Sequence, residues 1–151
     1  MRIFFRLLLT FGFAIMLGAC GSKDNGPTSS STSLPAQIVA TWTVQSITLN
    51  GVETQLAEAL GWGPTTATLK ITIEGNGKYS SSELDGKGAA VYTETGTASV
   101  DGQNITITVE AVNGQPLNPA EKKSGQWAAS GNNLTLTFND SGTIGVMRFI
   151  K

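Results

Sequence analysis

Side chains suited to covalent or acid–base chemistry are few in this 151-residue chain. It contains one cysteine, Cys20, and no histidine. Ser-His-Asp or Cys-His catalysis and histidine-based metal sites therefore cannot be built from it. Paired carboxylates can also act as acid and base, but we expect the candidates at turns or on polar strand faces, as solvated surface charges: Glu74, Glu83, Asp85, Glu94, Asp101, Glu110 and Asp140. We therefore expect no enzyme, no metal and no cofactor.

Aromatic residues are the other candidates for a functional site. Ligand cavities are mostly apolar with a few polar groups. Five aromatic side chains could line such a cavity or could equally fill an ordinary core: Trp42, Tyr79, Tyr92, Trp127 and Phe138. Trp62 differs because it lies in Gly61-Trp62-Gly63-Pro64, a connection in which a large aromatic has less reason to be structural. We expect it near a ligand if one binds.

The chemistry of Cys20 depends on the residues before it. A basic start containing Arg2 and Arg6 is followed by an apolar run from Leu7 to Leu17, which is the pattern of a signal peptide. The run has about 11 residues, whereas roughly 20 are needed for a permanent transmembrane helix. We therefore expect residues 1–19 to be removed on export.

The stretch Leu17-Gly18-Ala19-Cys20 resembles the lipobox of bacterial lipoproteins. The resemblance implies that Cys20 is lipidated and becomes the new N-terminus, and two or more acyl chains would anchor it stably. The alternative is an ordinary signal peptide cut near Ala19, which would leave an exposed thiol in an oxidising compartment. In Gram-negative lipoproteins an acidic residue directly after the cysteine favours the inner membrane. For a Gram-negative source, Gly21 and Ser22 therefore imply the outer membrane, facing the periplasm or the cell surface.

Residues 20–35 form a predicted tether rich in Ser, Gly and Pro, in which Leu34 alone is suited to a core. Such a composition buries too little apolar surface to offset its ordering entropy. Loss of residues 1–19 would change the net charge from −1 to −3, because it removes Arg2 and Arg6. This acidic excess argues against nucleic acid as a partner. The remaining residues, 36–151, are enough for one domain.

Turn signals divide residues 36–151 into eight segments. Each contains residues that accept positive φ: Asn50-Gly51, Gly75-Asn76-Gly77, Asp85-Gly86-Lys87-Gly88, Asp101-Gly102, Asn113-Gly114, Gly131-Asn132-Asn133 and Asn139-Asp140-Ser141-Gly142. Most segments alternate apolar and polar residues, as half-buried strands do. Eight antiparallel strands joined in sequence predict an all-β, up-and-down barrel. The alternative is a β-sandwich, which normally needs long crossing connections.

Local patterns refine this prediction. In residues 66–73 the apolar side chains of Ala67, Leu69, Ile71 and Ile73 share one face. In the first segment, Trp42 and Val44 lie in one phase and Ile47 and Leu49 in the other, so we expect a bulge near Gln45-Ser46.

Two predicted connections are longer than the short turns that join the other strands. Within residues 50–65, Val52, Leu56 and Leu60 recur at helical spacing before Gly61, which predicts a short helix. Residues 113–124 contain Pro116, Pro119 and the charged run 121–123, which predict a solvated loop.

The segment resembles the lipocalin-like domain carried by many small bacterial lipoproteins. The resemblance rests on Ala40-Thr41-Trp42 in place of the lipocalin Gly-x-Trp, on residues 75–79, and on Gly125-Gln126-Trp127 leading through Gly131-Asn132 to residues 134–137. It implies a barrel that binds a small apolar or amphipathic ligand, with residues 50–65 across its mouth. It also implies a basic residue over Trp42, for which Arg148 is the candidate.

Two function classes remain open at this point. One is a lipid-anchored module that holds a small ligand inside the barrel. The other is a non-enzymatic structural or interaction lipoprotein with a solid barrel, whose surface meets an envelope protein. An interior lined by small residues, with a mouth near Trp62, would favour the first class, and packed large side chains throughout would favour the second.

Overall fold

The computed structural model describes residues 33–59 and 66–151. Nearly all of them lie in strands, with one helix of four residues in the described part. The elements are β1 (Ala40–Leu49), β2 (Val52–Thr54), α1 (Leu56–Ala59), β3 (Thr66–Ile73), β4 (Lys78–Asp85), β5 (Ala90–Asp101), β6 (Asn104–Val112), β7 (Gln115–Ser130), β8 (Asn133–Asp140) and β9 (Thr143–Ile150).

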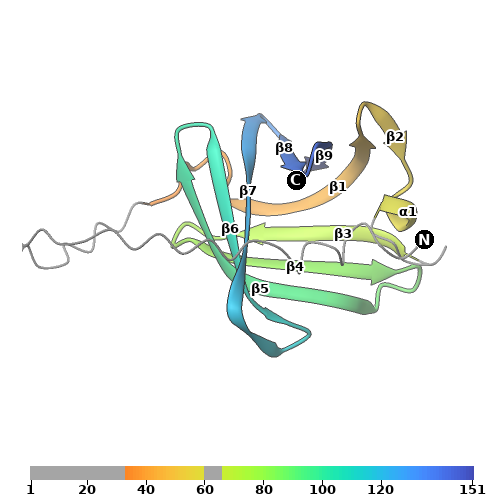
Figure 1. Cartoon of the computed structure of the whole chain (residues 1–151), viewed down its shortest axis with the longest axis horizontal. Coiled ribbons are helices and arrows are strands. Elements are labelled where there is room, and N and C mark those ends of the chain that lie inside the picture. The colour runs from red at the N-terminus through yellow and green to blue at the C-terminus, as the bar shows by residue number, and fades with distance from the viewer. Residues whose placement is uncertain (1–32, 60–65) are drawn as a thin grey trace, which may run out of the picture.

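The strands form a closed, antiparallel, eight-stranded barrel. From β3 to β9 each strand pairs with the next along the chain, and β1 closes the barrel by pairing with both β3 and β9 (Figure 1). The short β2 pairs only with the second half of β1. Closure leaves no long edge strand for unwanted pairing. The predicted barrel is confirmed, and the β-sandwich alternative is wrong.

The seven predicted turns fall at strand junctions. At the first, Asn50 and Gly51 both have positive φ, 50° and 81°, the backbone that a two-residue hairpin turn requires. Asn113 and Gly114 repeat this arrangement between β6 and β7. The predicted bulge in β1 is also present, because the pairing of β1 with β9 shifts register between Val44 and Ser46. It brings both Trp42 and Ile47 to the buried face.

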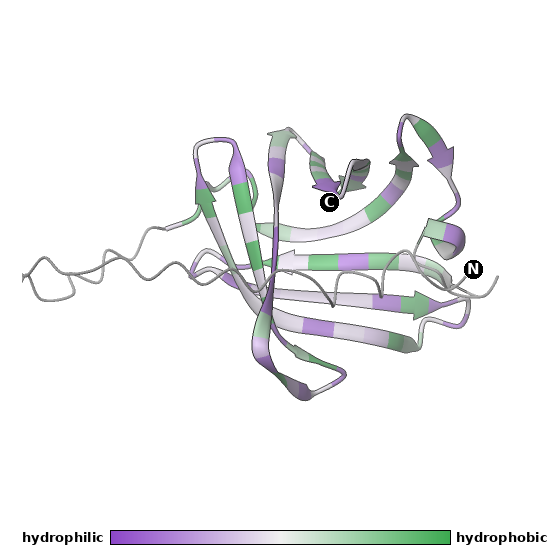
Figure 2. Ribbon diagram, viewed as in Figure 1, coloured by the Kyte–Doolittle hydropathy of each residue, from purple (hydrophilic) through white to green (hydrophobic). Residues whose placement is uncertain are grey.

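The barrel has two different ends. The Ile38 end is named for Ile38, which is fully buried there just before β1. It carries the turns β3–β4, β5–β6 and β7–β8. The α1 end carries the other turns together with β2 and α1 (Figure 1). Apolar residues alternate with polar ones along the strands (Figure 2).

The core is densest at the Ile38 end. Leu34 and Ile38, just before β1, are buried in it, and Trp42 and Phe149 are almost completely shielded from solvent. The indole Nε1 of Trp42 donates a hydrogen bond to the carbonyl oxygen of Ile38 at 2.9 Å. Leu34 lies in the predicted tether, so the folded part of the chain begins before residue 36.

Both predictions for irregular connections need correction. The expected short helix in residues 50–65 is present as α1, but among the described residues it does not include Val52, because the turn at Asn50-Gly51 sends Val52–Thr54 back along β1 as β2. Leu60 to Thr65, including Trp62, lie outside the described residues. Among the described residues, no helix is long and apolar enough to span a membrane.

The expected loop in residues 113–124 is instead part of β7. The two prolines are accommodated where the pairing of β6 with β7 shifts register between Val109 and Ala111, because residues 117–120 are looped out of the ladder. After this bulge the strand resumes at Glu121, and Lys123 faces the interior.

Candidate functional site

Polar side chains gather inside the barrel on β4 and β5. Side chains alternate between the two faces of a strand, so Tyr79, Ser81 and Glu83 on β4 all point inward. Their partners across the β4–β5 ladder are Gly96, Glu94 and Tyr92 in that order. Ser81, Glu83 and Glu94 are buried, with 5%, 5% and 6% of their surfaces exposed.

Glu94 is the centre of this group. Its Oε2 accepts hydrogen bonds from the Tyr79 hydroxyl at 3.3 Å and the Ser81 hydroxyl at 3.4 Å. Its Oε1 accepts from the Tyr92 hydroxyl at 3.1 Å and from Lys123 Nζ at 2.6 Å. Lys123 extends from β7, two strands away, to form this ion pair. We call these five residues together with Glu83 the Glu94 cluster.

The two tyrosines of the cluster remain hydrogen-bond donors at neutral pH. Burial raises the pKa of Tyr79 well above its ordinary value, and the negative charge of Glu94 raises it further. Burial and the same charge raise the pKa of Tyr92. Because both hydroxyls stay protonated, they remain available as hydrogen-bond donors to Glu94.

Glu83 has a different environment from Glu94. Its Oε2 is buried and, among the described residues, has no hydrogen-bond partner. Burial raises the pKa of Glu83 to about 7, the charge of Glu94 also raises it, and Lys123 partly offsets both effects. A buried polar atom without a partner costs about 1–3 kcal/mol. Glu83 therefore exchanges its proton near neutral pH in a site with an unused hydrogen-bonding position.

The prediction that Glu83 and Glu94 are solvated surface charges is wrong. Glu94 lies in the same strand phase as Ala98, and Glu83 lies in the phase of Tyr79, so both point inward. The alternation of inward and outward residues along each strand could have indicated from the sequence that both side chains point inward. Their charge favoured an exposed position instead, so the pattern was not recognised. Four of the other carboxylates expected at the surface are exposed, namely Glu74, Asp101, Glu110 and Asp140, and Asp85 is partly exposed.

The other candidate ligand-binding residues do not form one site. Tyr79 and Tyr92 belong to the Glu94 cluster, whereas Trp42 lies in the filled core at the Ile38 end. Trp127 is partly buried, and its Nε1 donates to the carbonyl oxygen of Gly102 at 3.1 Å. The structure does not describe Trp62.

The prediction that Arg148 covers Trp42 is also wrong. Arg148 precedes the inward Phe149, so it lies exposed on the outer face of β9, opposite Thr135 of β8. Lys151 takes the predicted position, with its Nζ 5.2 Å from the centroid of the Trp42 ring. This distance is within the range of a cation–π contact.

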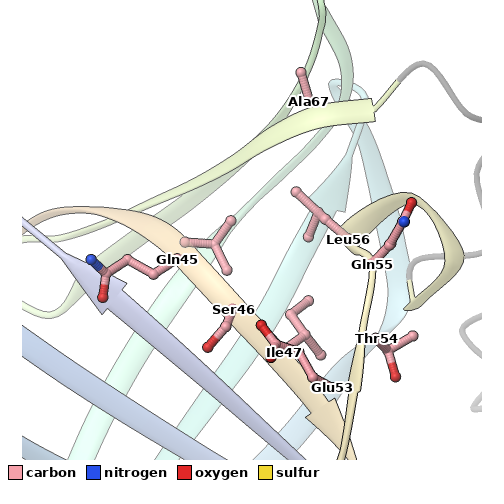
Figure 3. Close-up of a pocket in the computed structure, with 9 residues that line it drawn as sticks. Gln45, Ser46, Ile47, Glu53, Thr54, Gln55, Leu56 and Ala67 are labelled. Carbon is pink, nitrogen blue, oxygen red and sulfur yellow. The ribbon is translucent and has the colours of Figure 1, made fainter.

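A hollow of about 310 Å³ lies at the α1 end, where β1 and β3 separate. The two strands pair only through Ala40–Thr43 and Lys70–Ile73, and beyond these residues β1 turns to β2. Leu56 of α1 lies between β1 and Ala67 at the start of β3 (Figure 3). The hollow is lined by Val44, Gln45, Ser46, Ile47, Glu53, Thr54, Gln55, Leu56 and Ala67.

No residue of the Glu94 cluster lines the hollow, but the two are connected through β3. Leu69 of β3 is the cross-strand partner of Glu83, and Ala67 is the next residue in the same phase towards the α1 end. The hollow therefore offers an apolar surface at Ala67, two residues along β3 from the cross-strand partner of Glu83.

Metal binding finds no support in the part of the chain that the structure describes. No group of three or more His, Cys, Asp or Glu side chains is placed there to hold a metal ion. The Glu94 cluster itself combines two carboxyl groups with an ammonium group and hydroxyl donors, a set suited to hydrogen bonding.

Comparisons with known proteins show no family for this chain. No protein-family profile and no curated protein matches it. Among solved structures it is similar to a mutant of the vaccine antigen transferrin binding protein B from Haemophilus parasuis Hp5, with a TM-score of 0.34 and 11% identity. The match covers 76% of this chain and 27% of that chain. This chain therefore spans little more than a quarter of that protein, and so weak a likeness carries no argument about function.

Proposed function

We propose that this protein is a membrane-anchored lipoprotein whose barrel binds a small amphipathic ligand at the α1 end. The observation that carries the proposal is the buried, unpartnered carboxyl oxygen of Glu83 inside the barrel. The ligand would place its apolar part against Leu56 and Ala67 and its polar part towards the Glu94 cluster.

The contrast between the two ends of the barrel supports binding over a purely structural role. The Ile38 end is filled by large apolar side chains, among them Trp42 and Phe149. A solid structural barrel would be expected to continue that packing, because an unsatisfied buried polar atom destabilises the fold. Glu83 breaks this pattern. The hollow that Ala67 lines has a volume at the lower end of the usual range of ligand pockets, roughly 300–1,000 Å³.

Blocking the hollow tests this function. Ala67→Trp adds a bulky side chain at the hollow, whereas Ala128→Trp adds the same side chain on the exposed face of β7. N-phenyl-1-naphthylamine, a small apolar fluorescent probe, should bind the wild type and the Ala128→Trp variant and be displaced by short-chain amphiphiles. Ala67→Trp should weaken binding at least tenfold. If the wild type binds neither the probe nor the amphiphiles, the binding function is wrong and the structural or interaction role replaces it.

The membrane anchor is tested separately, because Cys20 lies outside the described residues. Cys20→Ala should abolish incorporation of a labelled fatty acid in a bacterium that expresses the chain, since it removes the thiol that carries the lipid. Ser22→Ala, which keeps the cysteine, should leave the label unchanged. Equal label in the Cys20→Ala variant and the wild type would contradict the lipoprotein assignment.

A further inference from the structure

The hydrogen-bonding capacity of the Glu94 cluster is satisfied around Glu94 but not at Glu83. Each oxygen of Glu94 accepts two hydrogen bonds, and Lys123 pairs with its charge at 2.6 Å. Glu83 is 95% buried, and its Oε2 has no partner among the described residues. Oε2 therefore lacks the donor that would satisfy its hydrogen-bonding capacity.

The charge around Glu83 indicates which donor would fit best. The charged groups that act on it are Glu94 of β5 and Lys123 of β7, which pair with each other, and its partner across β3 is the apolar Leu69. Tyr92 lies opposite Glu83 and remains a neutral hydroxyl. When Glu83 is ionised, the cluster therefore carries one uncompensated negative charge, which a monovalent cation would neutralise.

Among cations, an organic ammonium group suits this site better than a metal ion. Calcium takes 6–8 oxygen ligands and magnesium requires a near-octahedral shell, and the described residues contain no such group. An ammonium group carries three donors and a single charge, and a charge-assisted bond to a carboxylate is about twice as strong as a neutral one. An attached carbon chain directed along β3 from Leu69 towards Ala67 would enter the hollow that Ala67 lines.

We infer that the barrel recognises a primary amine, whose protonated nitrogen hydrogen-bonds to Glu83 while its carbon chain occupies the hollow between β1 and β3. This inference rests on the proposed binding function and specifies the chemical class of its ligand. No covalent bond forms or breaks at the nitrogen. The amine enters as the ammonium ion, and the proton displaced from Glu83 passes to solvent.

Binding should therefore depend on pH in a defined direction. Since the pKa of Glu83 is raised to about 7, only about a tenth of the carboxyl is ionised at pH 6 and about nine tenths at pH 8. An alkylamine stays protonated across this interval. Apparent affinity scales with the competent fraction, so the Kd for the amine should fall about tenfold from pH 6 to pH 8, with proton release.

Isothermal titration calorimetry on the full chain with n-octylamine, n-octanol and n-octanoate tests the inference. The amine should bind at least tenfold more tightly than the alcohol at pH 8, and the carboxylate should bind least tightly. Titrations at pH 6 in two buffers of different ionisation enthalpy should show release of close to one proton per amine. Glu83→Gln should weaken amine binding about 10- to 100-fold and remove its pH dependence. Glu110→Gln, on the outer face of β6, should change neither.

The possible results separate this inference from the proposed function. If octanol binds as tightly as octylamine with no dependence on pH, the amine assignment is overturned and the binding function stands. If Glu83→Gln binds the amine like the wild type, Glu83 is not the recognition group, and the inference is again overturned. If none of the three probes binds, both fail. Circular dichroism of each variant shows whether it is folded, so that a loss of binding can be attributed to the changed side chain.

Discussion

Glu83→Gln is expected to raise the free energy of unfolding by about 3 kcal/mol at pH 8. In the unfolded chain this carboxyl ionises near its ordinary pKa of 4.5, whereas in the folded barrel burial and Glu94 raise the pKa to about 7. Below pH 4.5 both states hold the proton, and Glu83 does not change stability. Between pH 4.5 and 7 the folded state binds more protons, so stability falls as pH rises. Above pH 7 the folded state carries the full cost of an ionised buried carboxylate.

Denaturant unfolding of both proteins from pH 4 to pH 8 measures this effect. The two curves should coincide near pH 4 and separate progressively up to about pH 7.5, with the variant more stable. Glu110→Gln should follow the wild type throughout, because its carboxylate is exposed. A constant difference between Glu83→Gln and the wild type at all pH values would show that Glu83 does not titrate between the two states.

Trp42→Ala is expected to lower the free energy of unfolding by about 3–5 kcal/mol, the usual cost of truncating a buried tryptophan. Trp42 has no exposed surface, and its Nε1 donates to Ile38. Its loss would leave a cavity and an unpaired carbonyl oxygen where the segment before β1 meets the core. A small domain has only about 5–15 kcal/mol of stability in total, so the variant would unfold at much lower denaturant concentration.

Trp127→Ala is the matched control for Trp42→Ala. Trp127 is also on the inner face of a strand, and its indole also donates to a backbone carbonyl oxygen, that of Gly102. Because its ring is only partly buried, we expect a loss of about 1–2 kcal/mol in urea unfolding. Equal losses for the two variants would contradict the view that the Ile38 end supplies most of the core.

The strands and turns were predictable because their causes are local. Alternation in residues such as Leu69, Ile71 and Ile73 places one face of β3 in the core, and Asn50-Gly51 supplies the positive φ of a hairpin turn. The bulge in β1 was predictable from the change of phase between Val44 and Ile47. The continuation of β7 through Pro116 and Pro119 was not, because it depends on register against β6.

The Glu94 cluster could not be found from the sequence because its stability is not local. A carboxylate such as Glu94 is normally exposed, since burial of a charge is costly without partners. Here the partners come from three strands, and Lys123 is 29 residues away along the chain. The prediction of Arg148 over Trp42, where the structure has Lys151, failed for a similar reason. Strand phase turns Arg148 outward, and Lys151, which follows the last residue of β9, reaches the ring instead.

The segment buried at the Ile38 end places the start of the folded chain at the end of the barrel opposite the hollow. The chain enters the barrel through Leu34 and Ile38, and the hollow bounded by Leu56 lies at the opposite end. Any attachment that precedes Leu34 would therefore join the barrel at its closed end and leave the hollow at the far end unobstructed by the anchored segment.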